Sequence, residues 1–233
     1  MESLIYSSLF LSAILSGLTV LYLKISSNNL KLILSFSGAF LFAISVLHLI
    51  PEVYASGHKS IGFFLQLLLE FFSEGIEHGH IHVHKHAEHA FPFTMMIGLS
   101  IHSFLEGMPL AENFIHESNS FKKPLLVGIV LHNIPIAIAL MSMLLQSHTQ
   151  KINAILLLIV FAAMAPLGAL FSSIIGERIT DVSVYFNGIM GIVIGIFLHI
   201  STTILFESSE NHRFNLLKFI TILLGAGVAL IAT

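Results

Sequence analysis

The chain has 233 residues, of which 55% are hydrophobic and only 10% carry a charge, and its 10 basic and 13 acidic residues give a formal net charge of −3. A soluble globular domain carries roughly 25% charged residues, so this composition excludes most water-facing folds and indicates a protein surrounded by membrane lipid. The low net charge leaves no basic surface for nucleic acid, and the lack of cysteine excludes disulfides, thiolate metal sites and cysteine nucleophiles.

Eight apolar runs follow one another along the chain, separated by short polar stretches. A helix that crosses the hydrocarbon core needs roughly 20 residues, and most of the runs are close to this length. The predicted spans are Leu4 to Lys24, Leu30 to Tyr54, Ser60 to Phe72, Phe91 to Ile115, Pro124 to Gln146, Ile152 to Ile175, Val182 to Phe206 and Phe214 to Ala232. The third is the weakest because it is short and runs into Glu70. The first has no basic segment before it and no clear small-residue cleavage site after it, so we expect a helix and not a signal peptide.

The basic residues indicate an orientation, because Lys and Arg gather in cytoplasmic loops. With eight spans, six of the ten fall in the loops after odd-numbered spans, and this weakly favours both termini on the extracytoplasmic side. The same arrangement places the low-complexity segment 77–89 in a cytoplasmic loop between the third and fourth spans. We therefore predict an all-α integral membrane protein, an eight-transmembrane-helix bundle that forms a single domain over residues 1–233.

Ionisable side chains gather in the fourth and fifth spans. Such a group within the membrane costs several kcal/mol unless it is paired or hydrated, so it marks a functional-site hypothesis. His102 and Glu106 are four residues apart, which places them on one helix face where they can chelate one cation. The fifth span adds His132 and Asn133, and imidazole with carboxylate suits zinc and similar divalent metals. We predict a metal site of His102, Glu106 and His132. Asn133 and Ser103 are candidate further ligands, with hydrogen bonds between helices as the alternative.

Other polar residues of the spans are candidates for a metal pathway. His48 and Glu52 repeat the four-residue spacing at the end of the second span. Glu112 continues the fourth span towards an outer vestibule. His199 stands among Ile and Gly in the seventh span, where a structural role is an equal alternative.

Prolines and glycines punctuate the same spans. Pro109 and Pro135 each remove a backbone hydrogen bond and are expected to kink helices beside the predicted ligands. Small residues let membrane helices approach closely, and we expect this role for Gly98, Gly107, Gly128, Gly168, Gly188, Gly191 and Gly195.

The segment 77–89 is rich in histidine. Such tracts bind metal through composition and without fixed geometry, and the binding weakens below about pH 6 because imidazoles protonate near pH 6.5. A metal buffer or sensor fits this behaviour, and a flexible linker without a metal role is the alternative. The predicted loop ligands are His78, His80, His82, His84, His86 and His89.

Several motifs resemble those of the ZIP (Zrt/Irt-like) divalent-metal transporters. The stretches Ser37 to Ala43 and His48 to Glu52 look like the second helix of that family, and the His-rich loop follows the third helix, where many members have one. Ile97 to Gly107 is similar to its fourth-helix signature. The fifth- and sixth-helix motifs are similar to Leu131 to Pro135 and Ala165 to Gly168.

The resemblance implies an eight-helix fold with both termini outside and a transport site between the fourth and fifth helices. His102, Glu106 and His132 match ligands of a first metal, and Ser103 and Asn133 match positions that complete a second site in some members. This chain departs from the pattern at Ile136, where the family usually has Glu, and Ala165 has no acidic side chain. We therefore predict a single bound metal ion. A homodimer is also implied, because several members are dimers.

The function that follows is transport of a divalent cation, most simply zinc uptake into the cytoplasm, with the cation as substrate and not as a catalytic cofactor. The alternative is a membrane metal sensor that uses the His-rich loop. An enzyme is not expected, because the sequence lacks the His-Glu-x-x-His motif that supplies two zinc ligands and a general base. No targeting peptide is recognised, so a cell (cytoplasmic or plasma) membrane is the expected location.

Overall fold

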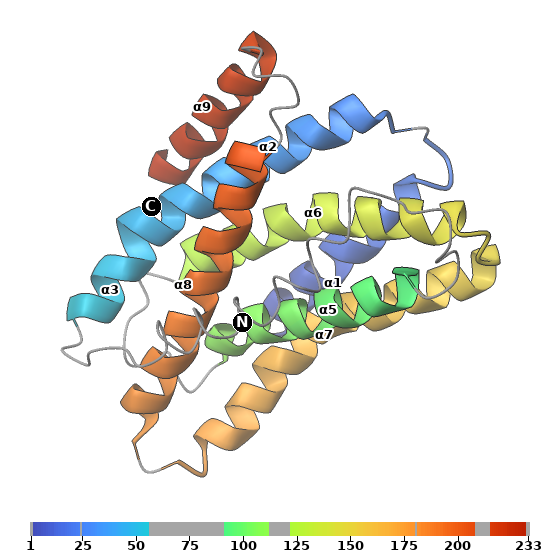
Figure 1. The fold of residues 1–233 in the computed structure, drawn as a ribbon. Helices are drawn as coiled ribbons and strands as arrows, with labels where there is room; N and C mark the ends of the chain where they lie inside the picture. The colour runs from blue at the N-terminus through green and yellow to red at the C-terminus, as the bar shows by residue number, and fades with distance from the viewer. Residues whose placement is uncertain are drawn as a thin grey trace.

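The computed structural model describes residues 2–23, 25–55, 91–111, 122–179, 181–207 and 215–231, and the regular secondary structure in these ranges is entirely helical (Figure 1). The helices are α1 (Glu2–Thr19), α2 (Ser27–Ile44), the π-helical turn η1 (Ser45–Leu49), α3 (Ile50–Ala55), α5 (Phe91–Gly107), the 3-10 turn η2 (Met108–Leu110), α6 (Lys122–Gln146), α7 (Lys151–Gly176), α8 (Val182–Glu207) and α9 (Leu216–Ile231).

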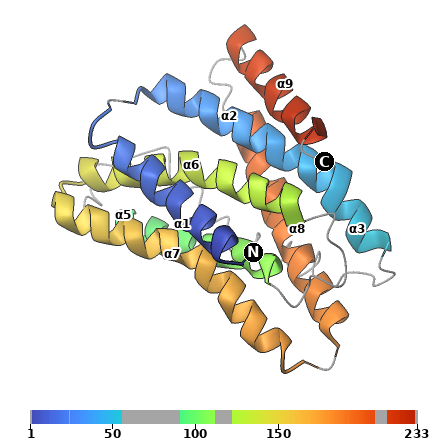
Figure 2. The same ribbon diagram turned by 180° about the vertical axis from the view of Figure 1, so that it is seen from behind.

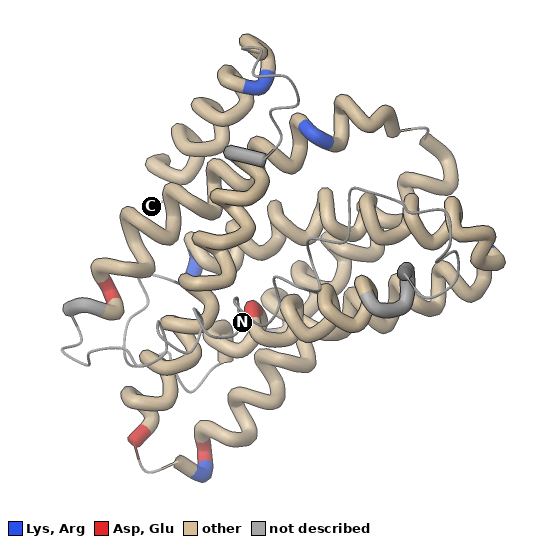
Figure 3. The backbone as a smooth tube through the Cα atoms, in the orientation of Figure 1, with Lys and Arg blue, Asp and Glu red and all other residues tan. Residues whose placement is uncertain are grey.

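The described residues confirm an all-helical integral membrane protein. Four helical stretches are long and apolar enough to cross a membrane, and two further apolar helices are shorter. Many large apolar side chains are exposed along them, as expected of a surface that faces lipid. Figure 3 shows that the coloured residues, Lys and Arg in blue and Asp and Glu in red, are few and that most of them lie near helix ends. The four long stretches are Ser27–Val53, Lys122–Gln146, Lys151–Gly176 and Val184–Leu205, and the shorter helices are Ser3–Thr19 and Leu216–Ile231. The predicted span Ser60 to Phe72 and the segment 77–89 lie outside the described residues.

Two predicted spans are less regular than expected. The α-helical part of the fourth ends at Gly107 and gives way to the 3-10 turn η2, although the apolar run predicts a helix as far as Ile115. Pro109 accounts for this change, because it has no N–H for the α-helical hydrogen bond. In the second span, the N–H of Ile50 donates to the carbonyl of Ser45, so one turn is wider than an α-helix. Pro51 follows this turn directly.

The helices form two packed groups (Figures 1 and 2). In one group, α1, α5, α6 and α7 pack against one another, and in the other, α2 packs on α8 and α9. The groups meet where α2 packs along α6. The Nζ of Lys122, at the start of α6, also donates to the carbonyl of Ala111, 2.8 Å away, which ties the first turn of α6 to the end of η2.

Glycines set the closest helix contacts. A Cβ added at Gly107 would overlap the backbone carbonyl of Ala165 on α7, and one added at Gly168 would overlap the carbonyl of Phe104 on α5. These reciprocal contacts bring α5 and α7 together at the end of α5 that carries Glu106. The expected role is not seen at Gly98 and Gly188, since a Cβ there would meet no described atom within 4 Å. Close packing matters here because lipid provides little hydrophobic drive for helices to associate.

Candidate metal centre

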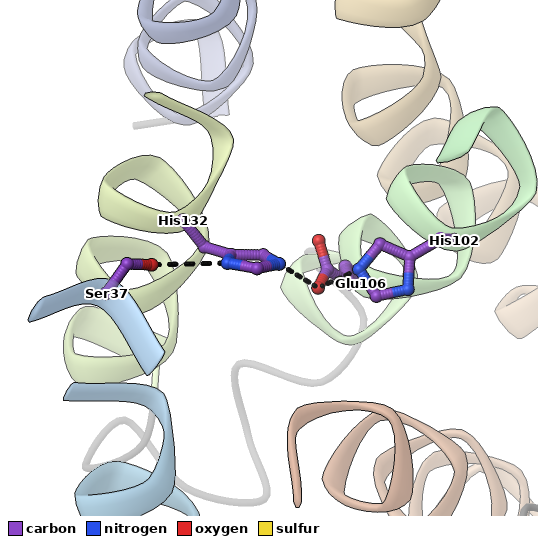
Figure 4. Close-up of polar contacts among 4 residues, drawn as sticks. All are labelled: Ser37, His102, Glu106 and His132. Atoms are coloured by element: carbon purple, nitrogen blue, oxygen red, sulfur yellow. Dashed lines mark hydrogen bonds and ion pairs between the residues drawn. The ribbon is translucent and has the colours of Figure 1, made fainter. Parts of the chain in front are cut away.

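Two members of the predicted metal site lie on α5. His102 and Glu106 are one helical turn apart, and the Nε2 atom of His102 lies 2.8 Å from Oε1 of Glu106 (Figure 4). The Glu106 side chain has no exposed surface, and that of His102 is 12% exposed. The four-residue spacing on a regular helix is sufficient to bring the two groups together.

The third member, His132, reaches the same carboxylate from α6. Its Nε2 atom lies 3.9 Å from Oε1 of Glu106, and its ring is edge-on to that of His102, with the ring centres 5.8 Å apart. On the opposite side of the ring, Nδ1 lies 3.2 Å from the hydroxyl oxygen of Ser37 on α2. Figure 4 shows the His132 ring between Ser37 and the pair on α5.

The three side chains offer donor atoms at distances that suit one metal ion. These atoms all lie within 4.8 Å of one another, and no second group of three or more His, Asp or Glu side chains with this property occurs in the described part of the chain. Zinc bonds to nitrogen and oxygen are near 2.1 Å, so neighbouring donors in a tetrahedral site are about 3.4 Å apart. The distances of 2.8 Å and 3.9 Å lie on either side of this value. Only small side-chain shifts would be needed to bind the ion.

Several atoms of the site are buried without a hydrogen bond. Oε2 of Glu106, Nε2 of His132 and Oδ1 of Asn133 have no hydrogen-bond partner among the described residues, and Oε1 of Glu106 contacts the two imidazoles alone in that part of the chain. Buried polar groups are nearly always satisfied, and a buried carboxylate is especially costly without positive charge. The ion-pair contacts described for Glu106 are with imidazoles and not with Lys or Arg. A divalent cation would satisfy the carboxylate and the imidazole nitrogens together.

The site lies deep in the bundle. His132 is ten residues after the start of α6 and fourteen before its end, about 15 Å and 21 Å along the helix. It also separates two apolar clusters, one containing Ile129 and the other Ile136. Both clusters continue onto α5, where His102 falls between Leu99 of the second cluster and Phe104 of the first. The polar site therefore lies in the middle part of α6, with apolar packing on both sides.

Comparison with known proteins identifies the family. A family model described as ZIP zinc transporter matches residues 73–233, which include α5 to α9. The chain belongs to the ZIP zinc transporter family. Membership confirms the resemblance seen in the motifs, and the family is one of transporters and not of enzymes.

Two curated proteins are similar to this chain. Protein zntD of Dictyostelium discoideum is 29% identical over 174 residues, which are 68% of this chain and 25% of that protein. Zinc transporter ZIP1 of Danio rerio is 27% identical over 181 residues, which are 76% of this chain and 56% of that protein. The chain therefore spans about a quarter and about half of the length of these relatives.

Near His102, Glu106 and His132 in this ZIP protein, some side chains have an atom that can bind a cation and others do not. Ser103 and Asn133 are both buried, 2% and 1% exposed, next to His102 and His132 in the sequence. Ile136 and Ala165 are buried in the apolar clusters, and their hydrocarbon side chains can bind no cation. The two positions at which the ZIP resemblance would allow further carboxylates therefore supply no ligand atom.

The candidate pathway residues are not part of this group. His48 lies in η1, Glu52 in α3 and His199 in α8, and all three are half-buried. None of them belongs to the cluster of donor atoms formed by α5 and α6. Glu112 lies outside the described residues, as do all six histidines predicted for the His-rich loop.

Ser37 was not among the predicted site residues, although it begins one of the ZIP-like stretches. A serine in an apolar helix is a weak signal, because its hydroxyl commonly bonds to the backbone of its own helix. Only the packing of α2 against α6 shows that the Ser37 hydroxyl meets the His132 ring.

Proposed function

We propose that this protein takes up zinc, or a similar divalent cation, into the cytoplasm through a single-metal site formed by His102, Glu106 and His132. The observation that carries the proposal is a fully buried carboxylate in contact with two imidazoles, with no hydrogen-bond partner for its second oxygen, Oε2, among the described residues. Family membership supports transport of the cation, as does the name of the similar protein zinc transporter ZIP1 of Danio rerio.

A single cation is favoured by charge and by ligand number. One carboxylate and two neutral imidazoles give the empty site a formal charge of −1, which becomes +1 with a divalent ion. Because Ile136 and Ala165 contribute no oxygen, a second cation nearby would meet electrostatic repulsion without a carboxylate to offset it. Asn133, Ser103 or a water molecule would complete four-coordination. A site with one carboxylate is expected to release its cation more readily than a site with two.

The wider arrangement is also proposed. Eight helices with both termini on the extracytoplasmic side would leave segment 77–89 in the cytoplasm, where its histidines would buffer or sense the imported metal. His48, Glu52, Glu112 and His199 would then provide weaker contacts along the route. A homodimer in a cell membrane is the assembly and location proposed for the chain.

Transport assays in liposomes test this function. Purified protein would be assayed for uptake of zinc, cadmium, manganese and iron(II), alongside the variants His102→Ala and Glu106→Ala. We expect saturable uptake of at least one ion and its loss in both variants. As a matched control, Glu177→Ala removes an exposed carboxylate at the end of α7 and should keep the uptake of the unmodified chain. If folded protein carries none of the four ions, or both site variants keep their uptake, the proposal is wrong.

Deletion of residues 77–89 separates the transporter from the sensor alternative. A transporter should keep its rate of uptake at saturating metal after the deletion, because the proposed site on α5 and α6 is unchanged. A protein whose main role is sensing through the His-rich loop would lose its metal response while carrying little metal in either form. Uptake by the intact and shortened chains in the same vesicles distinguishes these results.

A further inference from the structure

We propose that Ser37 is a positioning residue for metal binding, because its hydroxyl holds the His132 imidazole with Nε2 directed at Glu106. This inference rests on the proposed metal site and adds to it a residue from a third helix. Ser37 does not contact the carboxylate and is not proposed as a metal ligand.

The His132 ring lies between the Ser37 hydroxyl and the Glu106 carboxylate. Ser37 Oγ lies 3.2 Å from Nδ1 of His132, while Nε2 at the opposite edge of the ring lies 3.9 Å from Oε1 of Glu106. Both Ser37 and His132 are 1% exposed, so water does not compete for this hydrogen bond. Figure 4 shows the hydroxyl and the carboxylate on opposite sides of the imidazole.

Metal binding sets the protonation state of the His132 ring. A metal ion bound to Nε2 requires that nitrogen to be unprotonated, so the neutral ring carries its proton on Nδ1. The N–H at Nδ1 then donates a hydrogen bond to Ser37 Oγ, because a hydroxyl oxygen can act as an acceptor. A partner of this kind fixes the tautomer and the orientation of a metal-binding histidine. Without the hydroxyl, the buried N–H of the metal-bound ring would lack this partner.

The packing of α2 against α6 places Ser37 opposite His132. At Gly128, one turn before His132 on α6, an added Cβ would lie 3.4 Å from Leu41, one turn after Ser37 on α2. Leu41 and Gly128 are therefore in register with Ser37 and His132, and the two helices run in opposite directions. Ser37 and Leu41 share a face of α2 because they are four residues apart. The Ser37–His132 contact follows from this regular helix packing.

The hydrogen bond also joins the two helix groups. His132 and Glu106 belong to the group of α1, α5, α6 and α7, whereas Ser37 belongs to α2, which packs on α8 and α9. The orientation of one proposed ligand thus depends on a helix that contributes no ligand to the group of three.

Ser35 provides a matched control on the same helix. It is also 1% exposed, but its hydroxyl donates to the carbonyl of Lys31, 2.8 Å away in its own helix. Replacing either serine with alanine removes one buried hydroxyl from α2, and only the change at position 37 affects His132. A general effect of losing a buried hydroxyl would be the same in the two variants.

The experiment measures the zinc concentration dependence of uptake in liposomes for Ser37→Ala, Ser37→Thr, Ser35→Ala and His132→Ala. Loss of an outer partner of a metal ligand costs roughly 10-fold to 100-fold in metal affinity. We expect KM for zinc to rise by about this factor in Ser37→Ala, with the rate at saturating zinc retained, and to return towards the original value in Ser37→Thr. Ser35→Ala should keep the original KM, and His132→Ala should lose uptake.

The results separate this inference from the proposed function. If His132→Ala loses uptake but Ser37→Ala keeps the KM of Ser35→Ala, the positioning role of Ser37 is wrong and the metal site stands. If Ser37→Ala lowers the maximum rate of uptake and leaves KM unchanged, the positioning role is also wrong. Such a result indicates that Ser37 has a structural role only. If His132→Ala keeps normal uptake, the metal site itself is wrong, and the inference fails with it.

Discussion

Glu106 is the residue at which burial and charge conflict most strongly. A carboxylate with no exposed surface is unfavourable in a protein interior unless a positive charge or several hydrogen bonds compensate. The two imidazoles beside it are only partial compensation, because a neutral imidazole carries no net charge. Binding of a divalent cation at the proposed site would remove the conflict, so the same residue would be costly in the empty protein and favourable in the loaded one.

Substitution of Glu106 by glutamine is predicted to separate stability from metal binding. Glu106→Gln keeps the size of the side chain and removes the buried charge, so the metal-free protein should unfold at the same or a higher temperature. Zinc at 100 times Kd should stabilise the original chain by about 2.7 kcal/mol, and the variant should lose this gain. Thermal unfolding in one detergent, with and without zinc, measures both effects. Glu177→Gln serves as the exposed control, and a variant of Glu106 that still gains stability from zinc would contradict the prediction.

Ile136 is predicted to determine the number of bound ions. It follows His132 by one turn on the same face of α6, where a carboxylate could approach the site. Ile136→Glu should therefore increase the metal bound at the site from one ion to two, while Ile136→Gln, of similar size but neutral, should leave it at one. Metal analysis after a mild chelator wash, which removes weakly bound ions from the His-rich segment, measures the number. Two tightly bound ions in the original chain, or one in Ile136→Glu, would contradict this prediction.

Among the helices, the crossing of α5 and α7 supports the proposed metal site. Gly107 and Gly168 allow each helix to approach the backbone of the other, and Gly107 follows Glu106 directly. A methyl group at either position would push the helices apart at the end of α5 that carries the carboxylate. The burial and orientation of the Glu106 side chain therefore depend on two glycines that are not proposed as metal ligands.

Gly168→Ala is predicted to destabilise the protein through this crossing. The new Cβ would overlap the carbonyl of Phe104, a backbone atom that cannot move aside alone, and overpacking of this kind costs about 1–3 kcal/mol. Gly98→Ala is the control, since its Cβ would meet no described atom within 4 Å and alanine is the better helix former by about 1 kcal/mol. Thermal unfolding should show a lower unfolding temperature for Gly168→Ala than for the original chain, and no decrease for Gly98→Ala. Equal unfolding temperatures for the two variants would contradict the proposed role of the crossing.

Helix positions and the three-residue group could be predicted from the sequence for simple physical reasons. Long apolar runs mark membrane helices, and the four-residue spacing of His102 and Glu106 sets their contact within α5. Local irregularities were harder to predict, as the end of α5 before Pro109 and the wide turn η1 both interrupt apolar runs. The Ser37–His132 contact was not predictable, because it depends on the register of two helices that are distant in the sequence.

For the whole molecule, the two helix groups meet at the proposed site. The proposed cation ligands lie on α5 and α6, and the hydrogen bond that orients His132 comes from α2 in the other group. The apolar clusters on either side of His102 and His132 keep the site away from both ends of the bundle. The function proposed for the chain thus depends on the packing of helices that are far apart in the sequence.

The most direct test of a single-metal site is the position of bound zinc in crystals of the full chain. An anomalous difference map recorded at the zinc absorption edge locates the ion independently of the protein atoms. Our account predicts one strong peak between α5 and α6, about 2.0–2.2 Å from Nε2 of His102, Nε2 of His132 and a carboxylate oxygen of Glu106. A second strong peak beside Ile136, or zinc bound elsewhere with none at these three side chains, would contradict it.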